Sequence, residues 1–338
     1  MRWLLLSLAV VACSGSKAEE TKAEPLPTIP VGQPPTRAKP PNSVGGFKLE
    51  IPKVTLQPGE EKQICWVGPL NVEGPSRMVG GGVLRVGKGL HHGNVTTRPR
   101  RPDSVDYVRV CPPEKKNALG GEGTDVLDGG TVLFGSSTQL AGEEWQSFPE
   151  GMAFRVKEGF EIAARVHYLN ATKEPLEIQP AYEWFTVDQA KVQTELGAFL
   201  WTYPNFEIPP RTRTTVTARC PLPSPMKIVT LMPHMHKLGV QFTAGFLGGP
   251  LDGKNFLESK GYDPDKGLIM QWQPAVDTAH AEGVTFSCTW ENTFDKTILE
   301  GIGDNEMCMA FGYGYPVGKV YTLMGNEGTL CPALAPEP

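Results

Sequence analysis

The sequence predicts an all-β protein, in which two tandem antiparallel β-sandwich domains of jelly-roll type follow a signal peptide and a disordered linker. Gly (38) and Pro (32) are both abundant among the 338 residues, and no long stretch has the periodicity of an amphipathic helix. Short runs rich in Val, Thr, Phe and Tyr, separated by Gly and Pro, are typical of sandwiches and barrels. The length accommodates two domains. We therefore divide the chain into 1–12, 13–45, 46–188 and 189–338, the last two ranges being the domains.

The first twelve residues form the predicted signal peptide. Arg2 supplies a positive charge, and Trp3 to Ala12 form an apolar run that is too short to span a bilayer. The next residue, Cys13, completes a Val-Val-Ala-Cys sequence that resembles the bacterial lipobox, whose cysteine is lipidated. We expect an exported bacterial lipoprotein, anchored through Cys13 on the periplasmic or outer-membrane face. The alternative is an ordinary signal peptide that is cleaved nearby.

The linker is predicted from composition. Residues 14–43 are rich in Pro, Lys, Glu and Thr and contain almost no large apolar side chains. Such a segment cannot bury a core, so we expect a disordered, partly polyproline spacer.

The formal net charge of the chain is -5, without a basic patch, which argues against nucleic acid as a partner. We expect a monomer.

The cysteines indicate disulfide bonds. Besides Cys13 the chain has six, an even number in an exported protein, which predicts three disulfides. Six cysteines allow 15 pairings. Cys65 and Cys111 fall in the first half, so they must pair with each other if each half is a separate domain. The four cysteines of the second half leave their pairing open at this point: Cys220, Cys288, Cys308 and Cys331.

Alternating apolar and polar residues predict the strands. In the first domain the expected strands are 47–51, 61–67, 154–157 and 161–168. In the second domain a strand and turn at 206–211 precede strands at 214–220, 227–236, 239–249 and 283–290, and 304–316 is the last informative stretch.

The central stretch of the sequence is Leu231–Gly239, which contains His234 and His236. In a strand, residues two apart point to the same face, so the two imidazoles can form half of a metal site. The alternative is one buried, satisfied histidine and one exposed histidine. His91 and His92 are adjacent and can share an ion only where the strand kinks, and Gly89 and Gly93 on either side supply that freedom.

Five of the six histidines fall in three groups, because His167 lies in a further predicted strand. Considered alone, His167 would be structural, and His280, in a polar turn, is expected at the surface. Solvated histidines would scatter, so the grouping favours a metal site, and imidazole suits zinc, copper, iron and nickel. A thioether ligand would select copper, and Met307 beside Cys308 is the candidate; most methionines are core fillers.

These motifs, in this order, resemble those of the copper type II, ascorbate-dependent monooxygenases (peptidylglycine α-hydroxylating monooxygenase and dopamine β-monooxygenase). That family has an HH pair, a VHY strand, an HxHxxG strand, a C-T-Y-N-T run and a final E-M-C run. The resemblance covers about 47–331, and its second half is the more specific. The matching segments here are His91-His92, Val166-His167-Tyr168, His234-Met-His236-Lys-Leu-Gly239, Cys288-Thr-Trp-Glu-Asn-Thr293 and Glu306-Met307-Cys308.

The resemblance implies two copper ions per chain with different roles. The first would store and pass an electron, held by His91, His92 and His167. The second would bind dioxygen at the place where the C–H bond is cleaved, held by the catalytic residues His234, His236 and Met307. Ascorbate or another reductant would supply electrons. The resemblance also implies the disulfides Cys288–Cys308 and Cys220–Cys331.

Four positions depart from the peptide-amidating enzyme of that family. Met232 stands in place of its substrate-binding Arg, Met309 in place of an Asn, Phe311 in place of a Tyr, and Arg165 in place of a Gln. The loop after the HH pair also lacks its cysteines. A peptide carboxylate would therefore lack its expected partners. We expect a small organic molecule or a peptide as the substrate.

The expected function is copper-dependent hydroxylation of a C–H bond with O2 and a reductant. One alternative is a non-catalytic extracytoplasmic lipoprotein that senses, buffers or delivers copper, which would need the same ligands but no substrate site. A second alternative is a metal-free β-sandwich interaction module on a stalk.

Overall fold

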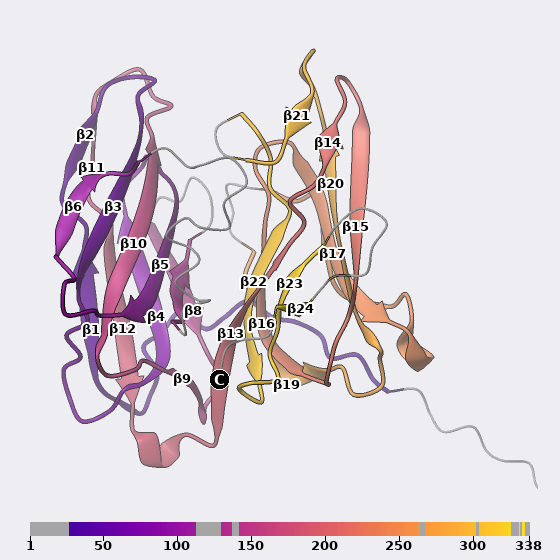
Figure 1. The fold of residues 1–338 in the computed structure, drawn as a ribbon, viewed down its shortest axis with the longest axis horizontal. Coiled ribbons are helices and arrows are strands. Elements are labelled where there is room, and N and C mark those ends of the chain that lie inside the picture. Colours follow the sequence, from indigo (N-terminus) through magenta and orange to yellow (C-terminus); the bar gives the residue numbers. More distant parts are fainter. Residues whose placement is uncertain are drawn as a thin grey trace, which may run out of the picture.

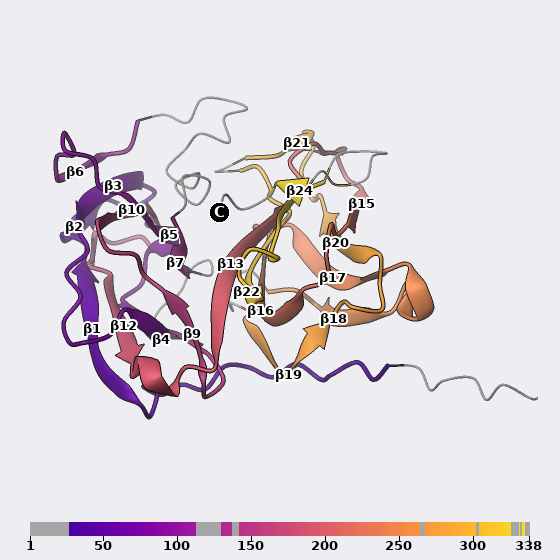
Figure 2. The same cartoon turned by 60° about the horizontal axis from the view of Figure 1, so that its bottom comes forward.

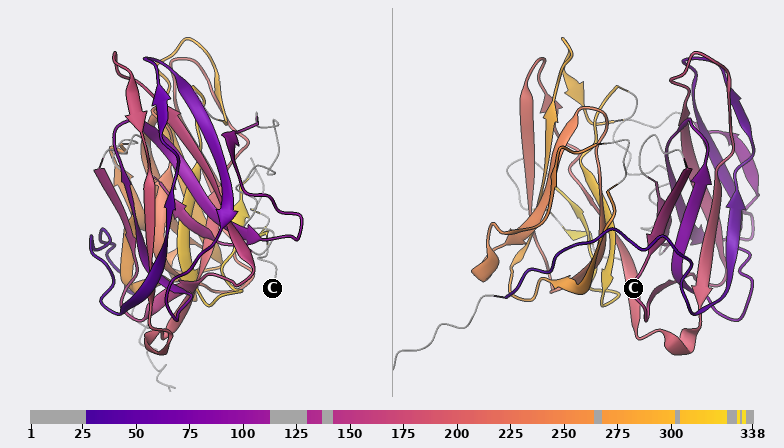
Figure 3. Two further views of the ribbon diagram at one scale, coloured as in Figure 1. Left: turned by 90° about the vertical axis from the view of Figure 1, so that its left-hand side faces the viewer. Right: turned by 180° about the vertical axis from the view of Figure 1, so that it is seen from behind.

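The computed structural model describes residues 27–112, 130–136, 142–263, 268–301, 304–325, 331 and 333–334. These residues form 24 strands and two short 3₁₀ helices, which confirms the all-β prediction. Figure 1 shows two sandwiches side by side, and Figure 3 shows the same pair from two further sides. Within the described ranges no helix has the length and apolar composition that a membrane crossing requires. The predicted signal peptide and Cys13 lie outside the described residues.

The first sandwich contains two sheets that pack face to face. One is a five-stranded sheet in the order β6-β3-β10-β5-β7, with bounds β3 Glu61–Pro69, β5 Leu90–Pro99, β6 Tyr107–Val110, β7 Val132–Gly135 and β10 Phe160–Leu169. The facing strands are β1 Ser43–Glu50, β4 Met78–Val86, β8 Gly142–Ser147, β9 Met152–Arg155 and β12 Ala181–Val187. A small separate sheet pairs β2 Val54–Leu56 with β11 Leu176–Ile178.

The second sandwich also contains two sheets. Its four-stranded sheet, in the order β15-β20-β17-β18, has the bounds β15 Arg213–Pro221, β17 Gly239–Leu247, β18 Asn255–Lys260 and β20 Gly283–Glu291. The facing strands are β13 Thr194–Thr202, β16 Lys227–His234, β19 Met270–Asp277, β22 Met309–Tyr315, β23 Thr322–Met324 and β24 Ala333–Leu334. The remaining elements are β14 Glu207–Ile208, β21 Ile298–Leu299 and the 3₁₀ helices η2 Gln189–Lys191 and η3 Gly249–Leu251.

Each sandwich encloses its own apolar core. Alternation along β10 points Ile162, Ala164 and Val166 into the first core, where they meet Trp184 from the facing sheet. The second core is rich in aromatic rings from both of its sheets, among them Phe199, Trp201, Phe242, Phe286 and Trp290. Burying such side chains fully stabilises the fold by about 1.5–3 kcal/mol each.

The two sandwiches nevertheless share one sheet. Strand β13 pairs in parallel with β9 of the first sandwich, with Thr194 opposite Met152 and Leu196 opposite Phe154. The same strand pairs antiparallel with β22 of the second sandwich. The result is an 11-stranded sheet that runs through both halves of the molecule. This continuous sheet fixes how the first sandwich faces the second, and therefore how far apart the two groups of histidines lie.

The prediction of a disordered linker over the whole of 13–45 is wrong for residues 27–45. Figure 2 shows this indigo segment running along the second sandwich beside β19 before it reaches β1. The backbone of Gln33 pairs with that of Gln271 in both directions, at 2.8 and 2.7 Å. Ile29 packs against the second core, and Pro40 lies beside the first-sandwich glycines Gly80 and Gly81. Composition did not indicate that this segment is ordered, because an extended chain can dock on a core that other residues have already formed.

All three expected disulfides are present: Cys65–Cys111, Cys220–Cys331 and Cys288–Cys308. The first lies in the first sandwich and the other two lie in the second. Three structural disulfides are the mark of an exported protein that folds in an oxidising, extracytoplasmic compartment.

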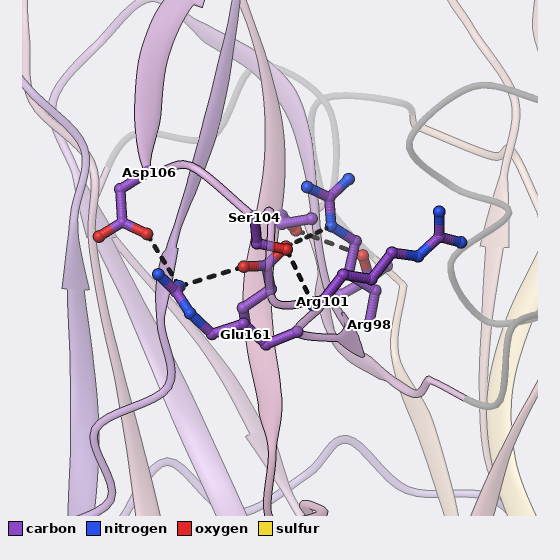
Figure 4. Close-up of polar contacts among 8 residues, drawn as sticks. Arg98, Arg101, Ser104, Asp106 and Glu161 are labelled. Carbon is purple, nitrogen blue, oxygen red and sulfur yellow. Dashed lines mark hydrogen bonds and ion pairs between the residues drawn. The ribbon is translucent and has the colours of Figure 1, made fainter.

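An ion-pair network around a buried carboxylate ties the far end of β5 to β10. The fully buried Glu161 carboxylate accepts hydrogen bonds from Arg98 (2.8 Å) and Arg100 (3.1 Å). Figure 4 shows the polar contacts around Glu161 and Arg98. Arg100 also pairs with Asp106, at 2.8 Å. Breaking a buried pair by removing one partner costs about 3–5 kcal/mol. The network therefore secures the strand pair that carries histidines at its other end.

Candidate metal centre

The first group of histidines lies on the strand pair β5–β10. His92 is directly opposite His167, and the register shifts between that pair and the next, where Tyr168 is opposite Leu90. His91 is thus the extra residue of a β-bulge, as expected for adjacent histidines that turn to one side. Gly89, with a φ of 101°, supplies the left-handed backbone beside the bulge. We call His91, His92 and His167 the first-sandwich triad.

The second group lies where β16 ends. His234 is the last residue of β16, and His236 lies two positions further along the chain. The observed strand is therefore two residues shorter than the predicted strand 227–236. Met235 between them is fully buried in the second core. The two rings therefore lie on the other side of the backbone, with their centroids 5.3 Å apart. We call His234 and His236 the second-sandwich pair.

The triad and the pair meet between the two sandwiches. The ring of His92 lies 5.6 Å from that of His234 and 5.9 Å from that of His236, measured between centroids. Within the triad, His92 lies 5.2 Å from His91 and 4.9 Å from His167. The structure thus joins five histidines into one contiguous group, the five-histidine cluster, with His92 at its centre. His280 is exposed, as expected.

A carboxylate orients the triad. Glu61, the first residue of β3, lies 2.5 Å from Nε2 of His167. Nε2 therefore carries the proton that this carboxylate accepts, which leaves Nδ1 as the electron-pair donor. That Nδ1 atom lies 3.1 Å from Nε2 of His92. The ligand nitrogens of the three triad residues lie within 4.8 Å of one another. A carboxylate on the far nitrogen of a histidine is the outer-shell arrangement that fixes ring orientation in metal sites.

A backbone carbonyl orients the pair in the opposite sense. Nδ1 of His236 donates to the carbonyl oxygen of Asn305, at 2.8 Å, which leaves Nε2 without a proton. Nε2 is buried and has no hydrogen-bond partner in the described structure. A buried polar nitrogen without a partner costs about 1–3 kcal/mol. Coordination of an ion would satisfy this atom.

Glu306 ties the loop that contains Met307 to the segment after His234. Its fully buried carboxylate accepts hydrogen bonds from the backbone N–H groups of His236 (2.8 Å) and Leu238 (2.7 Å). It also accepts one from the indole of Trp290 (2.9 Å) and one from the Met307 N–H. Burial raises the pKa of Glu306 to about 7. The carboxylate therefore holds both sides of this part of the centre together.

Two further links fix the same loop. Lys237 pairs with Asp304 at 2.8 Å, and Cys308 is bonded to Cys288 on β20. Met307 lies between these anchors and is half-buried. The hydrogen bonds of Glu306 to both N–H groups thus bring the backbone of Met307 close to that of His236, whereas the coordination of the Met307 sulfur stays a prediction.

Burial keeps the five imidazoles neutral at ordinary pH. Desolvation lowers the pKa of His91 and of His167 to about 4 and that of His234 to about 3, and neighbouring histidines add to the effect. Burial also places the pKa of His92 well below its usual range. For His236 burial lowers the pKa, against the hydrogen bond to Asn305, which raises it. Neutral imidazole is the form that binds metal.

Neutral rings, fixed tautomers and an unsatisfied nitrogen therefore fit a metal such as copper. Sequence reasoning found all five histidines but not Glu61, Asn305 or Glu306, which hold them. Glu306 and Asn305 directly precede Met307, so their place in that motif could have indicated them. Glu61 lies 106 residues from His167, and only the strand register brings them together.

No family model and no curated protein matches this chain. Among solved structures, the chain is similar to PBCV-1 VP54 fitted into a reconstruction of the virophage Sputnik, at 9% identity, with 87% of this chain and 98% of that chain covered and a TM-score of 0.27. It is also similar to the VP2 subviral particle of infectious bursal disease virus, at 9% identity, with 84% and 74% covered and a TM-score of 0.19. At such TM-scores these likenesses carry no argument about fold or function. The β-sandwich assignment rests on this chain's own strands.

Proposed function

We propose that this protein is an exported copper monooxygenase that hydroxylates an sp3 C–H bond of a small organic or peptide substrate. It would use O2 and two electrons from a reductant such as ascorbate. One observation carries the proposal: histidines from three distant parts of the chain converge into one partly buried cluster between two sandwiches. Histidines that served only as polar surface residues would have no reason to be grouped, buried and oriented in this way.

The triad would hold one copper ion, and the pair with Met307 would hold a second. Bound copper supplies dioxygen binding and one-electron redox chemistry. The chain's own contribution is preorganisation. Glu61 fixes the ring of His167, the carbonyl of Asn305 fixes that of His236, and burial limits the access of water. An all-imidazole set beside a set with a thioether offers two ligand environments of different softness, and therefore different redox roles.

The side chains beside the pair favour a substrate without a free carboxylate. Met232 and Phe311 are opposite each other on β16 and β22, where the resembling peptide-amidating enzyme carries polar side chains. Arg165, the cationic side chain of β10, donates hydrogen bonds to the amide oxygen of Gln63, at 2.7 and 3.0 Å. A free carboxylate on the substrate would therefore lack an obvious partner on these strands. As part of the same proposal, a lipid on Cys13 anchors the monomeric protein to a bacterial membrane.

The test is copper reconstitution followed by ascorbate-dependent O2 uptake over a panel of aromatic amines and peptides. We expect two coppers per chain and uptake with at least one panel member. His92→Ala and His234→Ala should each abolish uptake, and His280→Ala is the matched control on an exposed histidine. Two bound coppers without uptake on any panel member would contradict the enzyme proposal.

The second candidate, a copper carrier or buffer, is favoured by the burial of His236, whose Nε2 atom is inaccessible to solvent. A carrier would bind a single copper that stays reduced, and His234→Ala would remove it. Measuring copper stoichiometry and following the Cu(II) signal through a cycle of reduction and oxidation separates the two. If His234→Ala left the metal content unchanged, a metal-free interaction module would be supported instead.

A further inference from the structure

We infer that Met309 supplies a second thioether to the copper ion at the second-sandwich pair, in addition to Met307. The inference rests on the proposed copper centre and extends it by one ligand. The family resemblance gives no such role to this position, where the resembling enzyme has an Asn. The register of two strands and the direction of their side chains place Met309 at the pair.

The register places Met309 directly opposite His234. In the antiparallel pair β16–β22, His234 is the cross-strand partner of Met309, and Met232 is that of Phe311. Directly opposed residues have their Cβ atoms about 4.5–5.5 Å apart. Both His234 and Met309 are half-buried. A methionine side chain with three rotatable bonds can therefore bring its sulfur to the same ion as the opposite imidazole.

The packing on both sides of β22 settles the direction. Ala310 lies in the second core, whereas Phe311 and Tyr313 pack against the first core. Alternation therefore points Met309 toward the first sandwich. His234 points the same way, because its ring lies 5.6 Å from that of His92.

The backbone of Met309 is fixed on both of its edges. It pairs with Thr202 of β13 on one side and with His234 on the other. The preceding residue, Cys308, is tied to Cys288 and accepts a hydrogen bond at its carbonyl from Tyr203, at 2.9 Å. A ligand on a paired central strand is held more precisely than one on a loop. Met309 is therefore at least as well placed as Met307, which precedes the strand.

Two thioethers would give the pair a softer ligand set than one. Thioether sulfur favours Cu(I), and imidazole accepts both oxidation states. A second sulfur should therefore stabilise the reduced ion at the pair and leave the triad unaffected. The two halves of the cluster would then differ more strongly in reduction potential than a single methionine allows.

The experiment uses the full exported chain loaded with Cu(I) alone. Its readouts are Cu(I) affinity, by competition with a chromogenic chelator, and the number of copper–sulfur contacts, by X-ray absorption. Met309→Leu should remove about half of the copper–sulfur signal and lower Cu(I) affinity at the pair by at least the roughly tenfold loss that outer-shell changes produce. Met235→Leu, which removes a core-facing thioether between the two histidines, is the matched control and should change neither readout.

A second measurement avoids substitution altogether. In selenomethionine-labelled protein, X-ray absorption at the copper edge should show two selenium neighbours at the pair. One selenium neighbour, or an unchanged copper–sulfur signal in Met309→Leu, would overturn the inference and leave the copper proposal standing. Unchanged copper content in His234→Ala would overturn the copper centre, and Met309 as a ligand with it.

Discussion

The two halves of the five-histidine cluster are held by different means. The triad lies on two paired strands of the first sandwich, where the half-exposed carboxylate of Glu61 contacts His167. The pair lies at a strand end and is held by a backbone carbonyl, a fully buried carboxylate and a disulfide. The triad therefore depends mainly on sheet register, and the pair depends on a loop that several anchors hold in place. Changes to those anchors should affect the pair selectively.

The largest expected effects come from the disulfides. In the chain-entropy view the 46-residue separation of Cys65–Cys111 corresponds to about 4 kcal/mol and the 20-residue separation of Cys288–Cys308 to about 3 kcal/mol. Replacing each pair by serines should therefore lower the free energy of unfolding by these amounts in urea titrations. Only the second replacement should also weaken copper binding at the pair. Equal effects of both replacements on copper content would contradict the inference that Cys288–Cys308 supports the pair selectively.

Acid should destabilise the metal-free protein. The histidine pKa values are lowered on folding, so the unfolded chain binds more protons below its ordinary histidine pKa of about 6.5. Stability present above pH 6.5 is thus lost as the pH falls toward the folded pKa of about 4 for His91 and His167. The loss should be on the order of 3 kcal/mol for each of these two histidines, at 1.36 kcal/mol per pKa unit. Thermal melts between pH 7 and pH 4 measure it.

Glu306 acts in the opposite direction over part of that range. Its pKa is raised to about 7, so its stabilising contribution is full below its ordinary value of 4.5 and is lost as the pH rises toward 7. Because the histidines lose stability in acid and Glu306 does not, a variant that lacks His91 and His167 should lose less stability between pH 7 and pH 4 than the parent chain. A steeper loss in that variant would show that other groups dominate.

Glu306→Gln should cost about 1–3 kcal/mol, because the amide introduced by the substitution would present a donor to N–H groups that need an acceptor. Urea titration gives the free energy of unfolding. Copper titration should show weaker binding at the pair and unchanged binding at the triad. The buried Glu161 offers a contrast, because Arg98 and Arg100 compensate its charge far from the pair. Glu161→Gln should lower stability and leave copper binding at the pair unchanged.

The smallest effect on stability is expected for Glu61→Gln. The Glu61 side chain is 45% exposed, so its loss should cost less than about 1 kcal/mol. Copper affinity at the triad should nevertheless fall by about 10–100-fold, as for other outer-shell partners. Titration with copper measures the affinity, and the Cu(II) spectrum reports the changed ring orientation. If copper binding weakened at the pair and not at the triad, the assignment of Glu61 to the triad would be wrong.

Much of the strand pattern was predictable because alternation is a local property. The expected strand 214–220 is observed as β15 Arg213–Pro221, and 283–290 as β20 Gly283–Glu291. The order of the segment 27–45 was missed because it comes from docking on other parts of the chain, which composition does not report. The partner Glu61 was missed for the same reason, since it acts only through His167, which folding brings next to it.

Local patterns in the chain were enough to establish the β-sandwich class, the six paired cysteines and the identity of the five grouped histidines. These follow from alternation, residue type and motif order, which need no knowledge of distant neighbours. The contact between the triad and the pair, with His92 and His234 centroids 5.6 Å apart, came from the folded arrangement alone. That distance depends on the parallel seam between β9 and β13, a pairing of strands about 40 residues apart that no local pattern encodes.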